Sequence, residues 1–322
     1  MRSFIFVDYQ GNRLDYDRFI NSGIVLWRYL HQKLSQNLYE IKELGELKND
    51  TLIIAEESKI TQQLLAKYKN NKIIFINFES SLYLQKVTLG QNASRVDYSR
   101  YRFPLDEHNK ILSQYEIAVS RIKYKKRGIS LVASNKFRGK IDRFHWNLAN
   151  FKGYIRNESW QRDILSNLNR REKFIIQCSR SIAIDVVGSD WYLFLPAHYL
   201  NNIRIYPRIE DKRKFLLDYR FTVAFENIEE RRYFTEKVPE ALMCGACPIV
   251  PDTFMNIDSV PEGLFYTETE FLAGPDKCWS QFSERFVNQD TLTYLLNFSV
   301  ERVGKEIIKN EVLKQPSLPA ID

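Results

Sequence analysis

Short runs of apolar, often β-branched residues alternate along the chain with longer amphipathic segments. The short runs have the length of buried strands, and the longer segments repeat apolar residues at helical spacing. The pattern predicts strands at 3–7, 51–55 and 72–78, with helices at 17–36 and 59–69 between them. The alternation then starts again, with strands predicted at 129–133, 184–187, 221–225 and 247–250. The tail predicts two helices, at 291–296 and 300–313, that pack against the rest of the fold.

Strands that alternate with helices form βαβ units, whose strands are parallel. We therefore predict an α/β protein with two Rossmann-like domains, residues 1–125 and 126–322, that face each other across a cleft. Polar residues follow several predicted strands, among them Glu79, Ser134 and Glu226. Ligands of open parallel sheets bind at the carboxyl ends of the strands, so a ligand site is expected in this cleft.

Composition and hydropathy narrow the class of protein. The chain has 322 residues, of which 44% are hydrophobic and 27% are charged, as is typical of a globular protein with a substantial core. The longest uninterrupted apolar run covers residues 191–197, far short of the ~18 residues that a membrane span needs. The apolar run at the start ends at Asp8, too early for the core of a signal peptide. A cytoplasmic protein is expected.

Cysteine usage gives little sign of a metal centre. Of four cysteines, only Cys244 and Cys247 have the spacing of a zinc or redox motif, and no second pair accompanies them. They lie in an apolar stretch, where free thiols behave as small hydrophobic side chains. We expect buried thiols, no metal site and no required cofactor. A divalent ion bound to a phosphate-containing substrate stays possible.

The excess of positive charge lies in the first part of the chain. Residues 1–127 contain 21 Lys and Arg and 14 Asp and Glu, a net charge of +7, whereas residues 128–322 contain 26 of each. Five of these cations form a basic run, Arg121–Arg127. The basic run is either a solvated edge of the linker or a peripheral contact with the inner face of a membrane, where each charge contributes about 1 kcal/mol. No nucleic-acid module is recognised, so nucleic acid is not an expected partner.

The segment 219–242 contains the strongest chemical signal. A predicted strand ends at Glu226 and Asn227, and a polar loop then leads to a helix that Thr235 can cap, with Glu236 and Lys237 in its first turn. Backbone N–H groups at a helix start and a lysine ammonium attract a phosphate or diphosphate. The carboxylate and amide oxygens can accept hydrogen bonds from sugar hydroxyls. The alternative is a capped surface helix with an incidental lysine.

The order of residues in this segment resembles a known motif. The motif consists of Phe225-Glu226-Asn227, then Tyr233-Phe234-Thr235-Glu236-Lys237 and Gly245-Ala246-Cys247-Pro248-Ile249-Val250, and it is similar to the donor-binding motif of the α-1,3/4-fucosyltransferases. The resemblance implies the GT-B fold and transfer of L-fucose from GDP-fucose to a glycan hydroxyl, with inversion at the anomeric carbon. It also implies a bacterial-type enzyme that acts on a glycolipid, a surface polysaccharide or lipopolysaccharide.

The resemblance assigns roles to individual residues. Glu79 stands at the position of the general base, although Ser81 replaces the proline that the family usually has there. An arginine that contacts the diphosphate is expected after Ser134-Asn135, with Arg143 favoured and Arg138 as the alternate. The donor-binding residues implied are Asn135, Arg138, Arg143, Gly188, Glu226, Asn227, Tyr233, Thr235, Glu236 and Lys237.

Three alternatives to a fucosyltransferase stay open at this point. The first keeps the fold but uses another nucleotide deoxysugar as donor. The second is a non-catalytic protein that binds a sugar or a nucleotide. The third is a membrane-surface scaffold that acts through the basic run.

Overall fold

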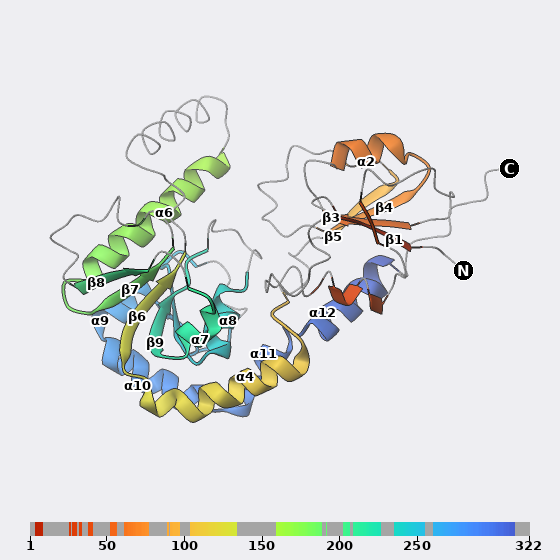
Figure 1. Cartoon of the computed structure of the whole chain (residues 1–322). Coiled ribbons are helices and arrows are strands. Elements are labelled where there is room, and N and C mark those ends of the chain that lie inside the picture. The colour runs from red at the N-terminus through yellow and green to blue at the C-terminus, as the bar shows by residue number, and fades with distance from the viewer. Residues whose placement is uncertain are drawn as a thin grey trace. The chain divides into compact units, whose positions relative to one another are not determined.

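The protein divides into two compact units (Figure 1). Unit 1 comprises Met1–His108 and Asn297–Asp322, and unit 2 comprises Asn109–Leu296. The structure is a computed structural model of the whole chain. It describes residues 4–8, 26, 28–30, 32–33, 38–40, 52–56, 61–76, 89, 91–96, 104–133, 159–188, 191, 202–206, 209–226, 235–254 and 260–312.

Unit 1 contains a parallel sheet of five strands in the order β2-β1-β3-β4-β5. Its elements are β1 (Phe4–Asp8), β2 (Leu38–Glu40), β3 (Leu52–Glu56), α2 (Thr61–Lys67), β4 (Lys72–Ile76) and β5 (Ala93–Val96). Leu64 of α2 is fully buried in one core cluster with Ile53, Ile73 and Phe75 of the sheet. The strands predicted at 3–7, 51–55 and 72–78 are β1, β3 and β4, and the helix predicted at 59–69 is α2. The described residues of the helix predicted at 17–36 are helical.

Unit 2 contains a parallel sheet of six strands in the order β11-β10-β9-β6-β7-β8. The strands are β6 (Arg127–Val132), β7 (Ile184–Val187), β8 (Ile203–Tyr206), β9 (Tyr219–Val223), β10 (Cys247–Val250) and β11 (Tyr266–Thr267). All residues of β7 and β10 are buried, as expected for parallel strands covered on both faces. Counted from β6, this is the strand order of Rossmann dinucleotide-binding domains. The strands predicted at 129–133, 184–187, 221–225 and 247–250 are β6, β7, β9 and β10.

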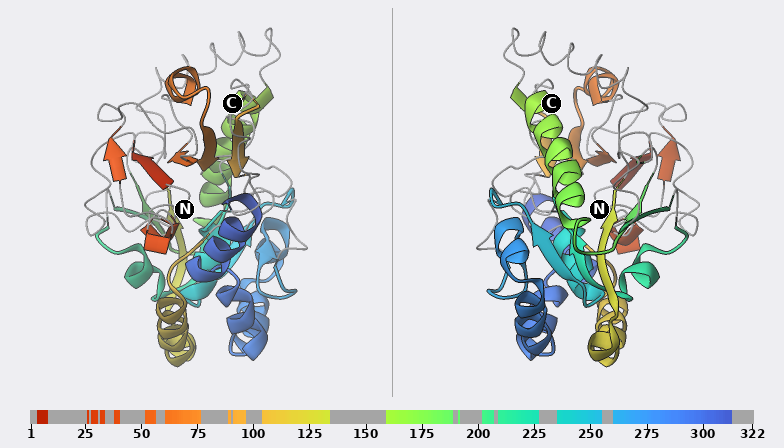
Figure 2. Two further views of the ribbon diagram at one scale, coloured as in Figure 1. Left: turned by 90° about the vertical axis from the view of Figure 1, so that its right-hand side faces the viewer. Right: turned by 90° about the vertical axis from the view of Figure 1, so that its left-hand side faces the viewer.

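Seven α-helices accompany this sheet in the part of unit 2 that the structure describes. They are α4 (His108–Arg121), α6 (Ser159–Cys178), α7 (Lys212–Leu216), α8 (Lys237–Met243), α9 (Glu268–Ala273), α10 (Pro275–Phe286) and α11 (Gln289–Leu296). Helices α4 and α10 lie at the end of the sheet where β6 begins (Figures 1 and 2). They contact each other through the rings of Tyr115 and Phe286, 5.2 Å apart, and the Tyr115 hydroxyl donates to the Phe286 carbonyl at 2.7 Å.

The Cys-Gly-Ala-Cys segment is the turn between α8 and β10. Gly245 has a φ of +65°, a left-handed conformation that glycine adopts without strain. Its N–H donates to the Leu242 carbonyl at 2.8 Å, and that of Ala246 donates to the Ala241 carbonyl at 2.9 Å, the bonds of a Schellman helix end. Cys244 and Cys247 are free, and burial raises the pKa of both thiols. The segment ends a helix, in line with the structural interpretation of its cysteines.

The chain returns to unit 1 after α11. Leu105 donates to the Phe298 carbonyl and Val300 donates to the Asp106 carbonyl, both at 2.8 Å, so residues 297–300 pair with the end of unit 1. Helix α12 (Val300–Ile307) and a following π-helical turn (Ile308–Val312) belong to this unit. The predicted division near residue 125 therefore differs from the one in the structure, which falls between His108 and Asn109 at the start of α4 and again after α11. The predicted tail helices are present as α11 and α12.

Candidate functional site

The strand order of unit 2 marks a ligand crevice. Strand β9 lies beside β6, although β7 and β8 come between them in the sequence, so the direction of winding reverses between these two strands. Open α/β sheets bind ligands outside the carboxyl ends of the strands at such a reversal. A small pocket lies there. It is lined by Leu131, Val132, Ala133, Arg171, Lys212, Leu216, Thr222, Val223, Phe225 and Lys237.

Three cations line this pocket, and the residues that line it include no acid. Arg171 comes from α6, while Lys212 and Lys237 are the first residues of α7 and α8. The other lining residues are apolar except for Thr222. Apolar walls lower the local dielectric constant and so strengthen the attraction between these cations and an anion. We name it the donor pocket, and its charge and place in the sheet suit a phosphate or diphosphate.

Glu226 holds one of these cations in place. It follows β9 and is 1% exposed. Its carboxylate accepts the Lys237 ammonium at 2.6 Å and the Thr235 backbone N–H at 3.0 Å. The Thr235 hydroxyl also donates to both carboxylate oxygens at 2.8 Å. Lys237 Nζ further contacts Thr235 Oγ1 at 3.1 Å, so the ammonium is fixed at two points.

The role of Thr235 differs from the prediction that it caps the helix. The cap position of α8 is Glu236, which makes no side-chain capping bond, and the Thr235 hydroxyl donates to Glu226. A buried carboxylate is a strong acceptor, and it takes both the hydroxyl and the N–H of Thr235. The expected cap was therefore wrong, although the same residues do meet at the helix start.

A second set of charges joins α7 to α8. Glu240 of α8 forms ion pairs with Lys212 and with Arg213 of α7, the latter at 3.5 Å. Burial alone would lower the pKa of Lys212, but Glu240 and Glu236 raise it above its usual value. Burial would also raise the pKa of Glu236, but Lys237 and Lys212 lower it below its usual value. These shifts keep Lys212 and Glu236 ionised at neutral pH.

Arg171 reaches the donor pocket from a helix that packs on the end of β9. It is 2% exposed, and its guanidinium donates to the backbone carbonyl of Phe225. Phe174, one turn further along α6, contacts Phe225 with ring centroids 5.5 Å apart. This packing aligns α6 so that a long cationic side chain enters the carboxyl edge of the sheet.

Of the remaining donor-binding and catalytic candidates predicted from the sequence, the structure describes Gly188. Gly188 follows β7 with a φ of 141°, and its N–H donates to the Tyr206 carbonyl at 2.9 Å, so it forms a turn at the same carboxyl edge. Six other candidates lie outside the described residues: Glu79, Asn135, Arg138, Arg143, Asn227 and Tyr233. Their roles stay predictions.

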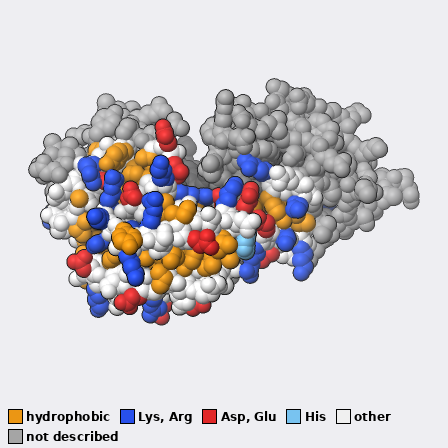
Figure 3. Space-filling model, turned by 60° about the horizontal axis from the view of Figure 1, so that its bottom comes forward, with side chains coloured by type: hydrophobic (Ala, Val, Ile, Leu, Met, Phe, Trp, Pro, Cys, Tyr) orange, Lys and Arg blue, Asp and Glu red, His pale blue; other side chains and the backbone are white. Residues whose placement is uncertain are grey.

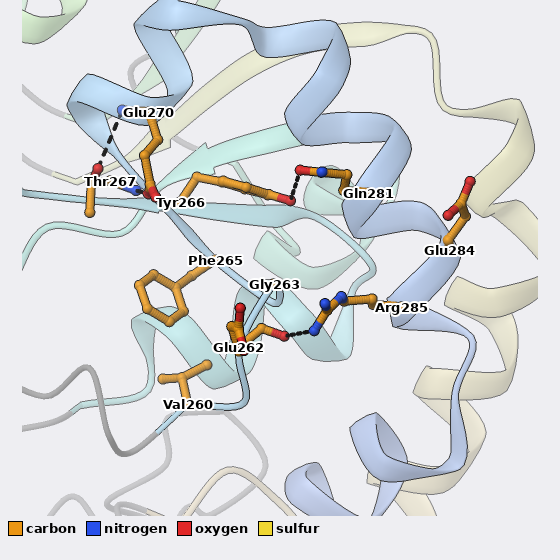
Figure 4. A pocket seen from close by; sticks show the side chains of 10 residues that line it. All are labelled: Val260, Glu262, Gly263, Phe265, Tyr266, Thr267, Glu270, Gln281, Glu284 and Arg285. Atoms are coloured by element: carbon orange, nitrogen blue, oxygen red, sulfur yellow. Dashed lines mark hydrogen bonds between the residues drawn. The ribbon is translucent and has the colours of Figure 1, made fainter.

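A larger cavity of about 740 Å³ lies beside the edge strand β11 (Figure 4). Three glutamates and one arginine contribute to its lining: Glu262, Glu270, Glu284 and Arg285. Arg285 donates to the Glu262 carbonyl at 2.8 Å, a bond that Figure 4 draws as a dashed line. With more carboxylates than cations, this cavity does not suit a diphosphate.

The described residues contain neither a cluster of metal ligands nor a membrane-spanning helix. Within the described parts of both units, no group of three or more His, Cys, Asp or Glu side chains lies close enough together to hold a metal ion. No described helix is both long and apolar enough to cross a membrane.

Comparisons with known proteins agree with this geometry. Residues 156–272 match the sequence model of the C-terminal domain of glycosyltransferase family 10, the fucosyltransferases. No curated protein sequence matches the chain.

Solved structures of glycosyltransferases share the fold of the whole chain. An α1,3-fucosyltransferase matches with a TM-score of 0.50 and 16% identity over 98% of this chain and 92% of its own. The Anabaena protein HepE in complex with UDP-glucose matches with a TM-score of 0.50 and 10% identity over 96% of this chain and 99% of its own. A glycosyltransferase from Rickettsia africae matches with a TM-score of 0.50 and 11% identity over 98% and 99%. The shared fold is GT-B, as predicted.

Sequence reasoning missed Arg171 and Lys212. It sought an arginine at 138 or 143, but the family match begins at residue 156 and contains Arg171. Both residues lie in segments rich in charge, Asn169-Arg170-Arg171-Glu172-Lys173 and Asp211-Lys212-Arg213-Lys214, where one pocket cation cannot be told from its solvated neighbours. The match to the sequence model of the family is what could have directed the search to Arg171 and Lys212, because it starts at residue 156 and covers both.

Proposed function

We propose that this chain is a glycosyltransferase of family 10, whose C-terminal domain model matches residues 156–272, and that it transfers L-fucose from GDP-fucose to a hydroxyl group of a glycan. The observation that carries the proposal is the donor pocket, where three cations from three helices meet at the carboxyl ends of β6 and β9. A sugar nucleotide presents a diphosphate to such a site. The glycosyltransferase activity itself follows from the family match.

The donor pocket provides the electrostatic part of the reaction. Negative charge grows on the diphosphate as its bond to the anomeric carbon breaks, and fixed cations in a site with apolar walls stabilise that charge. Lys237 is positioned for this task by Glu226, and Arg171 by its bond to Phe225. Lys212 adds a third positive charge and is itself held by Glu240. Glu226, Asn227 and Glu236 were all expected to accept hydrogen bonds from sugar hydroxyls; because Glu226 already accepts from Thr235 and Lys237, we assign that role to Glu236 and Asn227.

The acceptor side of the proposal rests on the motif resemblance. Glu79 removes the proton from the acceptor hydroxyl while that oxygen attacks the anomeric carbon, which inverts its configuration. The acceptor is a glycolipid, a surface polysaccharide or lipopolysaccharide, and the reaction takes place in the cytoplasm. A Glu79→Gln variant that turns over normally would remove this assignment.

The choice of nucleotide needs its own test, because the structures of the α1,3-fucosyltransferase and of HepE with UDP-glucose match this chain with the same TM-score. The assay is nucleotide release from GDP-fucose, from other GDP-deoxysugars and from UDP-glucose, with a panel of galactose- and N-acetylglucosamine-containing acceptors. Acceptor-stimulated release of GDP from GDP-fucose, lost in Lys237→Ala and retained in Lys214→Ala, supports the proposal. Lys214 is the matched control because it is an exposed lysine on α7. Release from UDP-glucose alone would reassign the donor, and binding without release would indicate a non-catalytic protein.

The proposal also includes a peripheral membrane contact through the basic run. Tyr124 is 74% exposed, and Lys123 and Lys126 beside it are also exposed. Figure 3 shows Lys and Arg side chains among hydrophobic ones on the side where the bottom of Figure 1 comes forward. Lys125, however, is buried, so the run offers fewer free charges than its sequence suggests.

The contact is tested by sedimentation with vesicles that contain anionic phosphatidylglycerol. Binding at low salt that weakens as salt rises supports an electrostatic contact. Equal recovery with neutral phosphatidylcholine vesicles would contradict it.

A further inference from the structure

One cation of the basic run lies inside the protein rather than on its surface. Lys125 is 4% exposed. Its ammonium donates to the backbone carbonyls of Leu216 at 3.2 Å, Leu217 at 2.6 Å and Cys244 at 2.9 Å. An ammonium has three donors, so these three acceptors satisfy it completely.

The three carbonyls belong to the ends of two helices. Leu216 is the last residue of α7 and Leu217 is its cap, while Cys244 is the cap of α8. Carbonyls in the last turn of a helix have no partner within the helix and bear a partial negative charge. Lys125 therefore caps both helices at once and joins their carboxyl ends, an arrangement that we name the Lys125 clamp.

The first residue of each of these two helices is a lysine of the donor pocket. Helix α7 begins at Lys212 and α8 begins at Lys237, and both lysines line the pocket. The helices are five and seven residues long, so the pocket lysine and the clamp are separated by roughly 6 Å along α7 and by roughly 10 Å along α8. The ion pairs of Glu240 with Lys212 and Arg213 join the helices along their sides.

We propose that Lys125 is a positioning residue for donor binding: by joining the carboxyl ends of α7 and α8 it fixes Lys212 and Lys237 at the separation that a diphosphate requires. This inference rests on the proposed function. Lys125 itself does not line the donor pocket, and its three bonds are to carbonyls at the carboxyl ends of the helices.

Among the described residues, few charged groups face the Lys125 ammonium, and its stem packs closely against the end of α8. The charged and titratable groups that face it are Cys244, Asp218 and Arg121. Arg121 and Asp218 lie 4.0 Å apart at the surface, so they compensate one another. On the α8 side, the lysine stem packs beside Gly245, where a Cβ would lie 3.4 Å from Lys125 Cε, an ordinary contact distance.

The test compares three variants at about pH 6, below the pKa of about 7 of Lys125, by calorimetric binding of GDP and by donor KM and kcat. Lys125→Met keeps the length of the apolar stem and removes all three donors. Lys125→Gln is the milder variant, with an amide that retains two donors. Lys214→Met is the control, an exposed lysine on α7 outside the donor pocket.

We expect Lys125→Met to weaken GDP binding and raise the donor KM about 10- to 100-fold, the scale of a misplacement of about 1 Å. Lys125→Gln is expected to lie between it and the wild type, and Lys214→Met to equal the wild type. If Lys125→Met does not fold, the graded effect of Lys125→Gln on the donor KM carries the test.

Failure of the positioning role can be distinguished from failure of the donor pocket assignment. If the wild type binds GDP and the folded Lys125 variants bind it equally well while only their melting temperature falls, Lys125 has a structural role and the positioning role is overturned. If the wild type binds neither GDP nor UDP, the donor pocket assignment fails and the positioning role falls with it.

Discussion

Lys237 and Glu226 form an ion pair of 2.6 Å at the carboxyl end of β9, with the carboxylate almost completely buried and the lysine side chain 18% exposed. The pair fixes the Lys237 ammonium at the donor pocket when no anion is bound. Because the pair is buried and lies at the donor pocket, removing either partner is expected to change both the free energy of unfolding and the affinity for GDP.

Lys237→Met leaves the Glu226 charge buried, with Thr235 as its remaining donor among the described residues. Loss of one partner of a buried pair is strongly destabilising, and we expect a fall of about 2 to 3 kcal/mol in the free energy of unfolding because Lys237 is partly exposed. Adding Glu226→Gln removes the unpaired charge, so the double variant should recover most of that stability. Its GDP affinity should stay as low as that of Lys237→Met. Denaturant unfolding and calorimetry on the same samples check both statements, and recovery of GDP affinity in the double variant would contradict them.

The stability of the protein is expected to depend on the ionisation of Lys125. Burial lowers the pKa of Lys125 from 10.5 to about 7. Between these values the unfolded chain keeps a proton that the folded protein has released, so stability rises with pH across this window. Below pH ~7 both states are protonated and the full cost of burying the charge applies.

The wild type should therefore gain stability relative to Lys125→Met as the pH rises from about 6 to about 9, by at most about 1.4 kcal/mol per pH unit. Urea unfolding of both proteins at three pH values in this range measures the difference. A difference that is independent of pH would show that Lys125 keeps its proton throughout the range.

Much of the fold was predictable from the sequence, and the reason is burial. Strands β1, β3, β4, β6, β7, β9 and β10 are short apolar runs, and their positions were confirmed within two residues. Strands β2, β5, β8 and β11 were missed because they are two to four residues long or mix polar and apolar positions, so no pattern distinguishes them from loops.

The site was only partly predictable. The motif placed Glu226, Thr235 and Lys237 together, which the structure confirms, but the sequence could not show that the Thr235 hydroxyl donates to Glu226. Lys125 looked like part of a surface patch, because nothing in a basic run indicates which lysine meets two helix ends. Such contacts depend on tertiary packing across about 90 to 120 residues of chain.

Gly304 of α12 is expected to tolerate no larger residue. A Cβ at this position would lie 2.4 Å from two ring carbons of Tyr29, so the helix packs directly on that ring. Alanine normally favours a helix by about 1 kcal/mol over glycine, but the clash should outweigh this and lower the free energy of unfolding by about 1 to 2 kcal/mol.

Gly274→Ala is the matched control for Gly304→Ala. Its Cβ would make only an ordinary contact of 3.7 Å with Lys277, and its φ of −174° suits any residue. Thermal unfolding should leave this variant close to the wild type. Equal melting temperatures for the two variants would contradict the packing of α12 on Tyr29.

The most direct test of the central claim is calorimetric binding of GDP and of guanosine to the wild type, Lys237→Met and Lys214→Met. If the three cations of the donor pocket hold a diphosphate, the wild type and Lys214→Met bind GDP far more tightly than guanosine, and Lys237→Met loses most of that difference while its guanosine affinity changes little. Equal affinity of the wild type for GDP and guanosine, or an unchanged difference in Lys237→Met, would contradict the account.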